Sequence, residues 1–155
     1  MKRSDELRPL SVEHHHNLFQ VFQIRKAIKG ELKVDQVVTK LLNEWEKVIE
    51  PHFEIEESIL IPAYKNSSDS NVGLMDTFYD QHRELRRCFS NLKDKTKRFS
   101  RDLLTNLADL LEKHIRFEER ELFPAVEASL SFSQMQMVGR MLNEKCVDYD
   151  QNVSK

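Results

Sequence analysis

At 155 residues, with 32% charged and 39% hydrophobic residues and little glycine or proline, the chain has the composition of a single globular domain, 1–155. A formal net charge of −2 gives no reason to expect nucleic-acid binding, and no apolar stretch approaches the roughly 20 residues of a membrane span. The N-terminus lacks a secretory apolar core and the two cysteines have no CxxC partner, so we expect a reducing, cytoplasmic setting without structural zinc.

Apolar residues recur at helical spacing along most of the chain and predict five helices. The expected ranges are 11–29, 34–64, 72–97, 100–128 and 131–148. Residues 1–10 read as a lead-in, after which Ser11 is a plausible N-cap. Pro51, Pro62 and Pro124 fall inside predicted helices, where we expect kinks.

The first four predicted helices are long and amphipathic, and short connections join them. This pattern favours an all-α fold, an antiparallel up-and-down four-helix bundle over about 11–128. The fifth, at about 131–148, is a short extra C-terminal helix.

Two segments of the chain repeat one motif. His52–Pro62 reads HFEIEESILIP and His114–Pro124 reads HIRFEERELFP. Both share a histidine, a glutamate four residues later, a second glutamate directly after it, a leucine and a closing proline. On a helix, the spacing of four places histidine and glutamate on one face. Two such pairs facing each other would make most of a metal site.

A buried histidine is more often a hydrogen-bonded core residue than a ligand, and a histidine–glutamate pair is often a surface pair. On a helical wheel, however, His52, His82 and His114 share the apolar stripes of their helices. Burying Glu56 and Glu118 as ions beside them would cost several kcal/mol each without compensation, which bound cations supply. Imidazole and carboxylate suit iron, manganese or zinc, and two carboxylates able to bridge favour a pair of metals.

The chain resembles the hemerythrin-like, HHE cation-binding domains. The resemblance covers about 10–128, and its motifs are Glu13-His14-His15, His52-x-x-x-Glu56, Asp80-Gln81-His82-Arg83-Glu84-Leu85 and His114-x-x-x-Glu118. It implies a four-helix bundle holding two iron ions that an oxo or hydroxo group, Glu56 and Glu118 bridge, with manganese and zinc as alternative metals. The implied metal ligands are His14 or His15, His52, Glu56, His82, His114 and Glu118.

The first-helix ligand has two candidates. Leu18, Val21 and Ile24 keep His14 on the apolar stripe, whereas the stripe of His15 turns polar, so His14 is the first choice.

One position departs from the pattern of the oxygen-carrying hemerythrins. Those proteins have a second histidine one turn after the third-helix histidine, and here that position is Arg86. One metal is therefore expected to lack a histidine, which leaves an open position or one filled by water, carboxylate or tyrosine. This departure favours a redox-active or sensing centre over reversible oxygen carriage.

The leading hypothesis is a cytoplasmic di-iron protein that binds or reacts with O₂, NO or peroxide, with a redox partner or a second copy of the chain as its candidate protein partner. One alternative is iron storage, donation or sensing. Another is a metal-free helical interaction module, with Met135, Met137 and Met141 as its partner surface. The sequence has no hydrolase motif, and whether the chain is an enzyme, for example in peroxide or NO reduction, stays open.

Overall fold

The computed structural model describes residues 2–94 and 100–146, and all the regular structure in these ranges is helical. The predicted all-α class is therefore confirmed. The elements are α1 (Arg8–Ile28), α2 (Val34–Glu44), η1 (Trp45–Ile49), α3 (Glu50–Ile55), η2 (Glu56–Leu60), α4 (Ile61–Lys65), α5 (Val72–Lys93), α6 (Arg101–Phe117), η3 (Glu118–Leu122), α7 (Phe123–Ser129) and α8 (Phe132–Lys145). The expected helix ends at 97 and 148 lie outside the described residues.

The helix starts follow local capping. The Ser100 side chain accepts a hydrogen bond from the backbone of Leu103 at the start of α6, and Ser131 opens α8 with a capping box. The predicted N-cap at Ser11 is wrong, because α1 already begins at Arg8. Pro9 lies in the first turn of α1, where a backbone N–H has no partner within the helix, so the missing N–H of proline costs nothing there. The lead-in is therefore shorter than expected.

The three prolines inside the long helices each follow a wider, π-helical turn. The turns η1, η2 and η3 end two residues before Pro51, Pro62 and Pro124. A proline has no N–H to donate and its ring crowds the carbonyl four residues earlier, so the helix accommodates it by widening. Both bridging candidates, Glu56 and Glu118, open such a turn.

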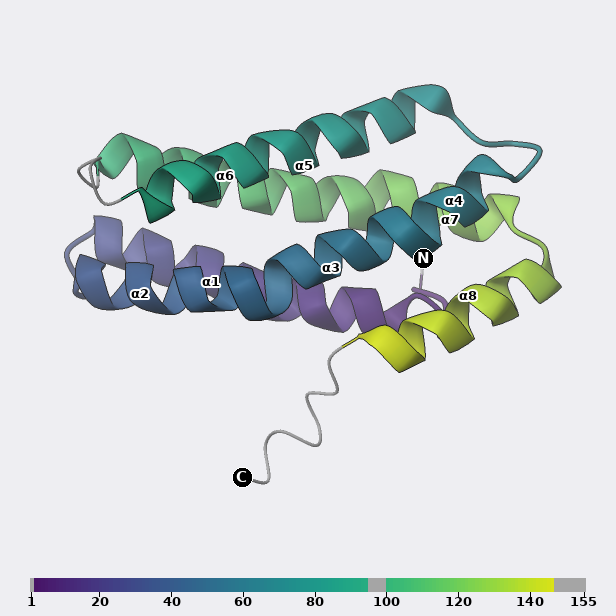
Figure 1. The fold of residues 1–155 in the computed structure, drawn as a ribbon, viewed down its shortest axis with the longest axis horizontal. Helices are drawn as coiled ribbons and strands as arrows, with labels where there is room; N and C mark the ends of the chain where they lie inside the picture. Colours follow the sequence, from purple (N-terminus) through teal and green to yellow (C-terminus); the bar gives the residue numbers. More distant parts are fainter. Residues whose placement is uncertain (1, 95–99, 147–155) are drawn as a thin grey trace.

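Four long helical stretches lie side by side and alternate in direction: α1, α2 to α4, α5, and α6 to α7 (Figure 1). Helix α1 contacts α2 and α6, and α5 contacts the same two helices, so the four surround a common interior. Helix α8 is an added fifth helix, which packs against α1 and η2.

The interior contains two apolar clusters. One gathers around α4, α7 and α8 and includes Leu10, Phe78 and Leu122; the other gathers around α2 and the first part of α6 and includes Val21, Leu85 and Leu111. Along each long helical stretch, the predicted ligand residues of the interior lie where the members of one cluster give way to those of the other, within a few residues of the change. A polar layer therefore crosses the middle of an otherwise apolar core.

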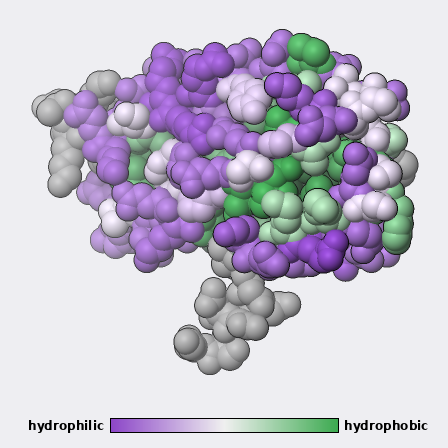
Figure 2. Space-filling model, turned by 45° about the vertical axis from the view of Figure 1, so that its right-hand side comes forward, coloured by the Kyte–Doolittle hydropathy of each residue, from purple (hydrophilic) through white to green (hydrophobic). Residues whose placement is uncertain are grey.

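On the face shown in Figure 2, hydrophilic side chains cover most of the surface and surround a hydrophobic area. Within the described ranges, no helix combines the length and apolar character needed to cross a membrane.

Candidate metal centre

Six of the seven predicted site residues come together in the polar layer. They form two groups that share both glutamates, and the ligand atoms of each group lie within 4.8 Å of one another. We call the first group position A and the second position B. Position A comprises His14, His52, Glu56 and Glu118, and position B comprises His82, His114, Glu56 and Glu118. All six residues are at most 2% exposed, whereas His15 is exposed and belongs to neither group.

Each glutamate presents one carboxylate oxygen to each position. Glu56 Oε1 lies 2.8 Å from His52 Nε2, and Glu56 Oε2 lies 3.2 Å from His82 Nε2. Glu118 Oε2 lies 2.8 Å from His14 Nε2, and Glu118 Oε1 lies 3.2 Å from His114 Nε2. Two carboxylates spread in this way could each offer one oxygen to a metal ion in either position.

The atoms that face one another across the layer are close, but none of them is hydrogen-bonded. The Nε2 atoms of all four histidines and both oxygens of each glutamate are buried without a hydrogen-bond partner. Leaving one buried polar atom unsatisfied costs about 1–3 kcal/mol, and a charged one costs more. Eight such atoms around one interior point are the donor set of a metal centre, and two metal ions would satisfy them together. The residues present therefore fit the metal pair that the sequence predicts.

The outer nitrogen of each histidine does have a partner. The Nδ1 atoms of His14, His52, His82 and His114 lie 2.7, 2.9, 2.8 and 2.8 Å from side-chain oxygens of Glu119, Glu13, Glu57 and Gln81 respectively. An Nδ1–H donated to such an acceptor fixes the tautomer that leaves Nε2 free to bind metal. Sequence reasoning did not identify these four partners, although each directly precedes or follows a ligand residue in the chain.

Two arginines support the outer carboxylates. Arg86 reaches both Glu50 (2.8 Å) and Glu57 (2.7 Å), and Arg3 pairs with Glu119 at 3.0 Å. Ser11 also donates to Glu119, over 2.6 Å. Arg86, where a further histidine was considered, therefore turns outward and supports the partner of His82.

Aromatic rings line the polar layer. Phe53 stacks on His82 with 3.9 Å between the ring centroids, Phe78 lies 4.0 Å from the same ring, and Phe123 stacks on His14 at 5.3 Å. Phe78 occupies the position one turn before His82 and Arg86 the position one turn after it, so neither neighbouring turn supplies position B with a third imidazole. The rings also help to bury the cluster, whose ligand atoms are shielded from solvent.

The charged groups of the cluster shift one another's pKa values. Burial opposes a charged His52, but Glu56 and Glu13 outweigh it and raise the pKa of His52 to about 9. Burial likewise opposes a charged His82, whose pKa its glutamate neighbours raise to about 10. Burial prevails at His114 and lowers that pKa to about 4. Although burial opposes it, the adjacent imidazoles hold the pKa of Glu56 well below its ordinary value. Without metal, the positive charges of His52 and His82 therefore offset the negative charges of the buried carboxylates.

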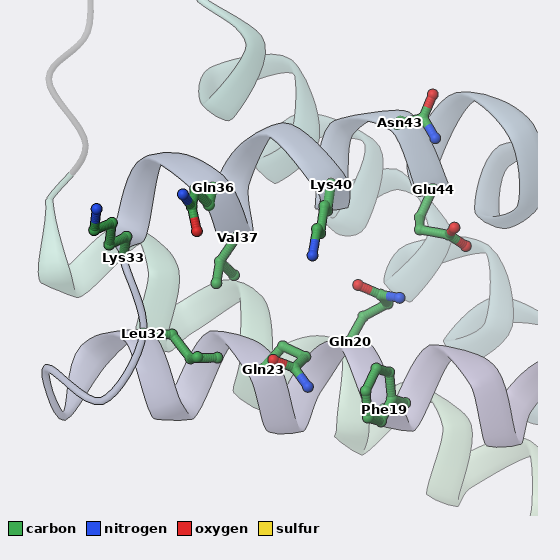
Figure 3. Close-up of a pocket in the computed structure, with 10 residues that line it drawn as sticks. All are labelled: Phe19, Gln20, Gln23, Leu32, Lys33, Gln36, Val37, Lys40, Asn43 and Glu44. Carbon is green, nitrogen blue, oxygen red and sulfur yellow. The ribbon is translucent and has the colours of Figure 1, made fainter.

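A surface pocket of about 270 Å³ lies elsewhere, between α1 and α2. Its lining mixes lysines, amides and apolar side chains, among them Phe19, Gln23 and Lys40 (Figure 3). None of its lining residues belongs to position A or B.

Comparison with known proteins shows the family of the chain. The family model of the hemerythrin HHE cation-binding domain matches residues 10–126, which include all six clustered side chains. The DNA nickase of Nostoc sp. (strain PCC 7120 / SAG 25.82 / UTEX 2576) is 29% identical over 101 residues, which are 64% of this chain and 28% of that protein. The chain thus spans less than a third of that relative. No solved structure matches the chain significantly. On the family match, this chain belongs to the hemerythrin HHE cation-binding domain family.

Proposed function

We propose that the chain binds two iron ions between Glu56 and Glu118 and that this centre binds or reduces a small ligand: O₂, NO or peroxide. The observation that supports this proposal is the set of eight buried, unpartnered nitrogen and oxygen atoms in two groups that share both carboxylates. In a metal-free helical module, protonated imidazoles would have to compensate both buried carboxylates, and burial keeps His114 from contributing such a charge.

The choice of iron follows from the donor set. Four imidazoles and two carboxylates, with no cysteine in either group, suit iron, and they also accept manganese or zinc. A ferrous pair, when bound, supplies the electrons that oxygen, nitric oxide or peroxide accept. The protein's part is to hold the two ions at bridging distance through Glu56 and Glu118 and to fix the imidazoles through their outer hydrogen bonds.

The burial of the two shared glutamates limits the size of a ligand that can reach the centre. Glu56 and Glu118 are fully buried, and Phe53 and Phe78 close over the ring of His82. A diatomic molecule or peroxide suits such a dry interior, whereas a polymer backbone does not. The proposal for this chain therefore does not include an activity on DNA, which the name of the longer relative, DNA nickase, describes.

Metal analysis and rapid kinetics test the proposal. Protein purified without added metal is expected to contain close to two iron ions per chain, and His114→Ala is expected to lower this number while exposed His15→Ala preserves it. After anaerobic reduction, stopped-flow mixing with O₂, NO or H₂O₂ should change the absorption spectrum with at least one of them. Little metal of any kind would contradict the metal centre.

The same experiment separates the proposal from iron storage or donation. A donor is expected to bind iron weakly, to release it to a mild chelator and to show no fast spectral change with any of the three ligands. The alternative hypothesis of a helical interaction module predicted a partner surface of three methionines. Only Met137 and Met141 are exposed, whereas Met135 is buried. Full folding without metal, together with absent metal binding, would favour that reading.

A further inference from the structure

We propose that the two metal positions are unequal in affinity, and that Gln81 makes position B the weaker one. This inference rests on the proposed dinuclear centre and concerns how its two halves differ. The groups facing the metals give no reason for a difference, because each position receives two imidazoles and one oxygen from each shared glutamate. The hydrogen bonds behind the imidazoles, in contrast, do differ between the two positions.

Half of those hydrogen bonds are equivalent between the two positions. Glu119 holds His14 of position A, and Glu57 holds His82 of position B. Each of these two carboxylates directly follows a bridging glutamate in the chain, and each is paired with an arginine. Their effects on the two positions should therefore be similar.

The other half differ in charge. The residue directly before His14 is Glu13, which reaches across to His52 Nδ1 at 2.9 Å. The residue directly before His82 is Gln81, which reaches across to His114 Nδ1 at 2.8 Å. The two contacts occupy matching places in the two halves of the chain, α1 to α4 and α5 to α7. One acceptor, however, is a carboxylate and the other is a neutral amide.

A carboxylate acceptor strengthens the ligand in front of it. It draws the Nδ1 proton and so raises the basicity of Nε2, and it adds a negative charge near the metal. Glu13 is 1% exposed, so solvent does not screen that charge. Changing such an outer partner typically alters metal affinity by about 10–100-fold, so position A should fill first and position B should follow at higher metal concentration.

Titration of the metal-free protein with Co²⁺ against a competing chelator tests the inference, with native mass spectrometry to count bound ions. The wild-type chain is expected to load in two steps separated by at least about tenfold in affinity. Gln81→Glu should tighten the second step by about tenfold and bring the two together, and Glu13→Gln should weaken the first. The control is Arg83→Gln, which changes net charge as Gln81→Glu does, at a side chain that is 71% exposed.

Two further variants assign the steps to the positions. His114→Ala should abolish the weak step and keep the tight one, whereas His52→Ala should abolish the tight one. Circular dichroism on each variant verifies that the helices remain. Two ions bound with equal affinity, unchanged by Gln81→Glu, would overturn the inference while leaving the metal centre intact, and loss of the tight step in His114→Ala would also overturn it. A wild-type chain that binds no ion would instead refute the proposed function.

Discussion

Stripping the metal from the loaded protein is expected to lower its thermal unfolding midpoint by roughly 10–20 °C. The structure provides two binding positions. At a free metal concentration of about 300 times the Kd of the tighter position and about 30 times that of the weaker one, the two add about 3.4 and about 2.0 kcal/mol to the free energy of unfolding, so both add about 5 kcal/mol. For a chain of this length, about 1 kcal/mol moves the midpoint by about 2–4 °C. The metal-free chain should still fold, because apolar clusters flank the polar layer on both sides.

Calorimetry or circular dichroism on loaded, chelator-treated and reloaded protein measures this shift. The matched pair of variants is His14→Ala and His15→Ala, which change neighbouring histidines inside and outside the cluster. His15→Ala should keep the full shift, whereas His14→Ala should lose the larger part of it, because position A, the tighter one, loses a ligand. A shift of the same size in both variants, or no shift in the wild type, would refute the reasoning.

Three further outcomes are expected. Despite burial, nearby carboxylates raise the pKa values of His14, His52 (to about 9) and His82 (to about 10), so these side chains carry protons at pH 7.5 that metal must displace. Loading should release about three protons per chain, and binding should strengthen as pH rises toward 9–10; a pH-stat measurement showing no release would contradict this. Glu57→Gln should weaken metal binding at position B by about 10–100-fold, and an unchanged chelator competition would count against the outer hydrogen bond. Gly139→Ala should lower the unfolding free energy by about 1 kcal/mol in urea titrations, because its added Cβ would lie 2.9 Å from the N-terminal segment; a more stable variant would show that this contact is not maintained.

Helical periodicity was enough to predict the helices, since the apolar stripes of α1, α5 and α6 are also the surfaces that meet in the core. The start of α1 was missed because Ser11 resembles an N-cap, while its hydroxyl in fact serves Glu119 across the bundle. The prolines were expected to kink the helices, and the structure shows a widened, π-helical turn before each of them. How a helix accommodates a proline depends on the side chains packed around it, and the local sequence does not specify those.

The ligand residues were predictable because their signal is local, a histidine and a glutamate four residues apart on an apolar stripe. Their outer partners were not, because the four hydrogen bonds join residues separated by 105, 39, 25 and 33 positions in the chain. Which carboxylate reaches which imidazole depends on how the four long helices pack, and a single sequence does not specify that.

The two consecutive glutamates of the repeated motif have different roles in the packed structure. Glu56 and Glu118 face the metal positions, while the glutamates directly after them, Glu57 and Glu119, hold histidines of neighbouring helices. Consecutive residues on a helix point about 100° apart, so one motif can supply a ligand on one side and a support on the other. The first half of the chain, α1 to α4, thus supplies Glu57 to His82, and the second half, α5 to α7, supplies Glu119 to His14. Each half also holds one of its own imidazoles, His52 through Glu13 and His114 through Gln81, so the outer hydrogen bonds of the four histidines need both halves together.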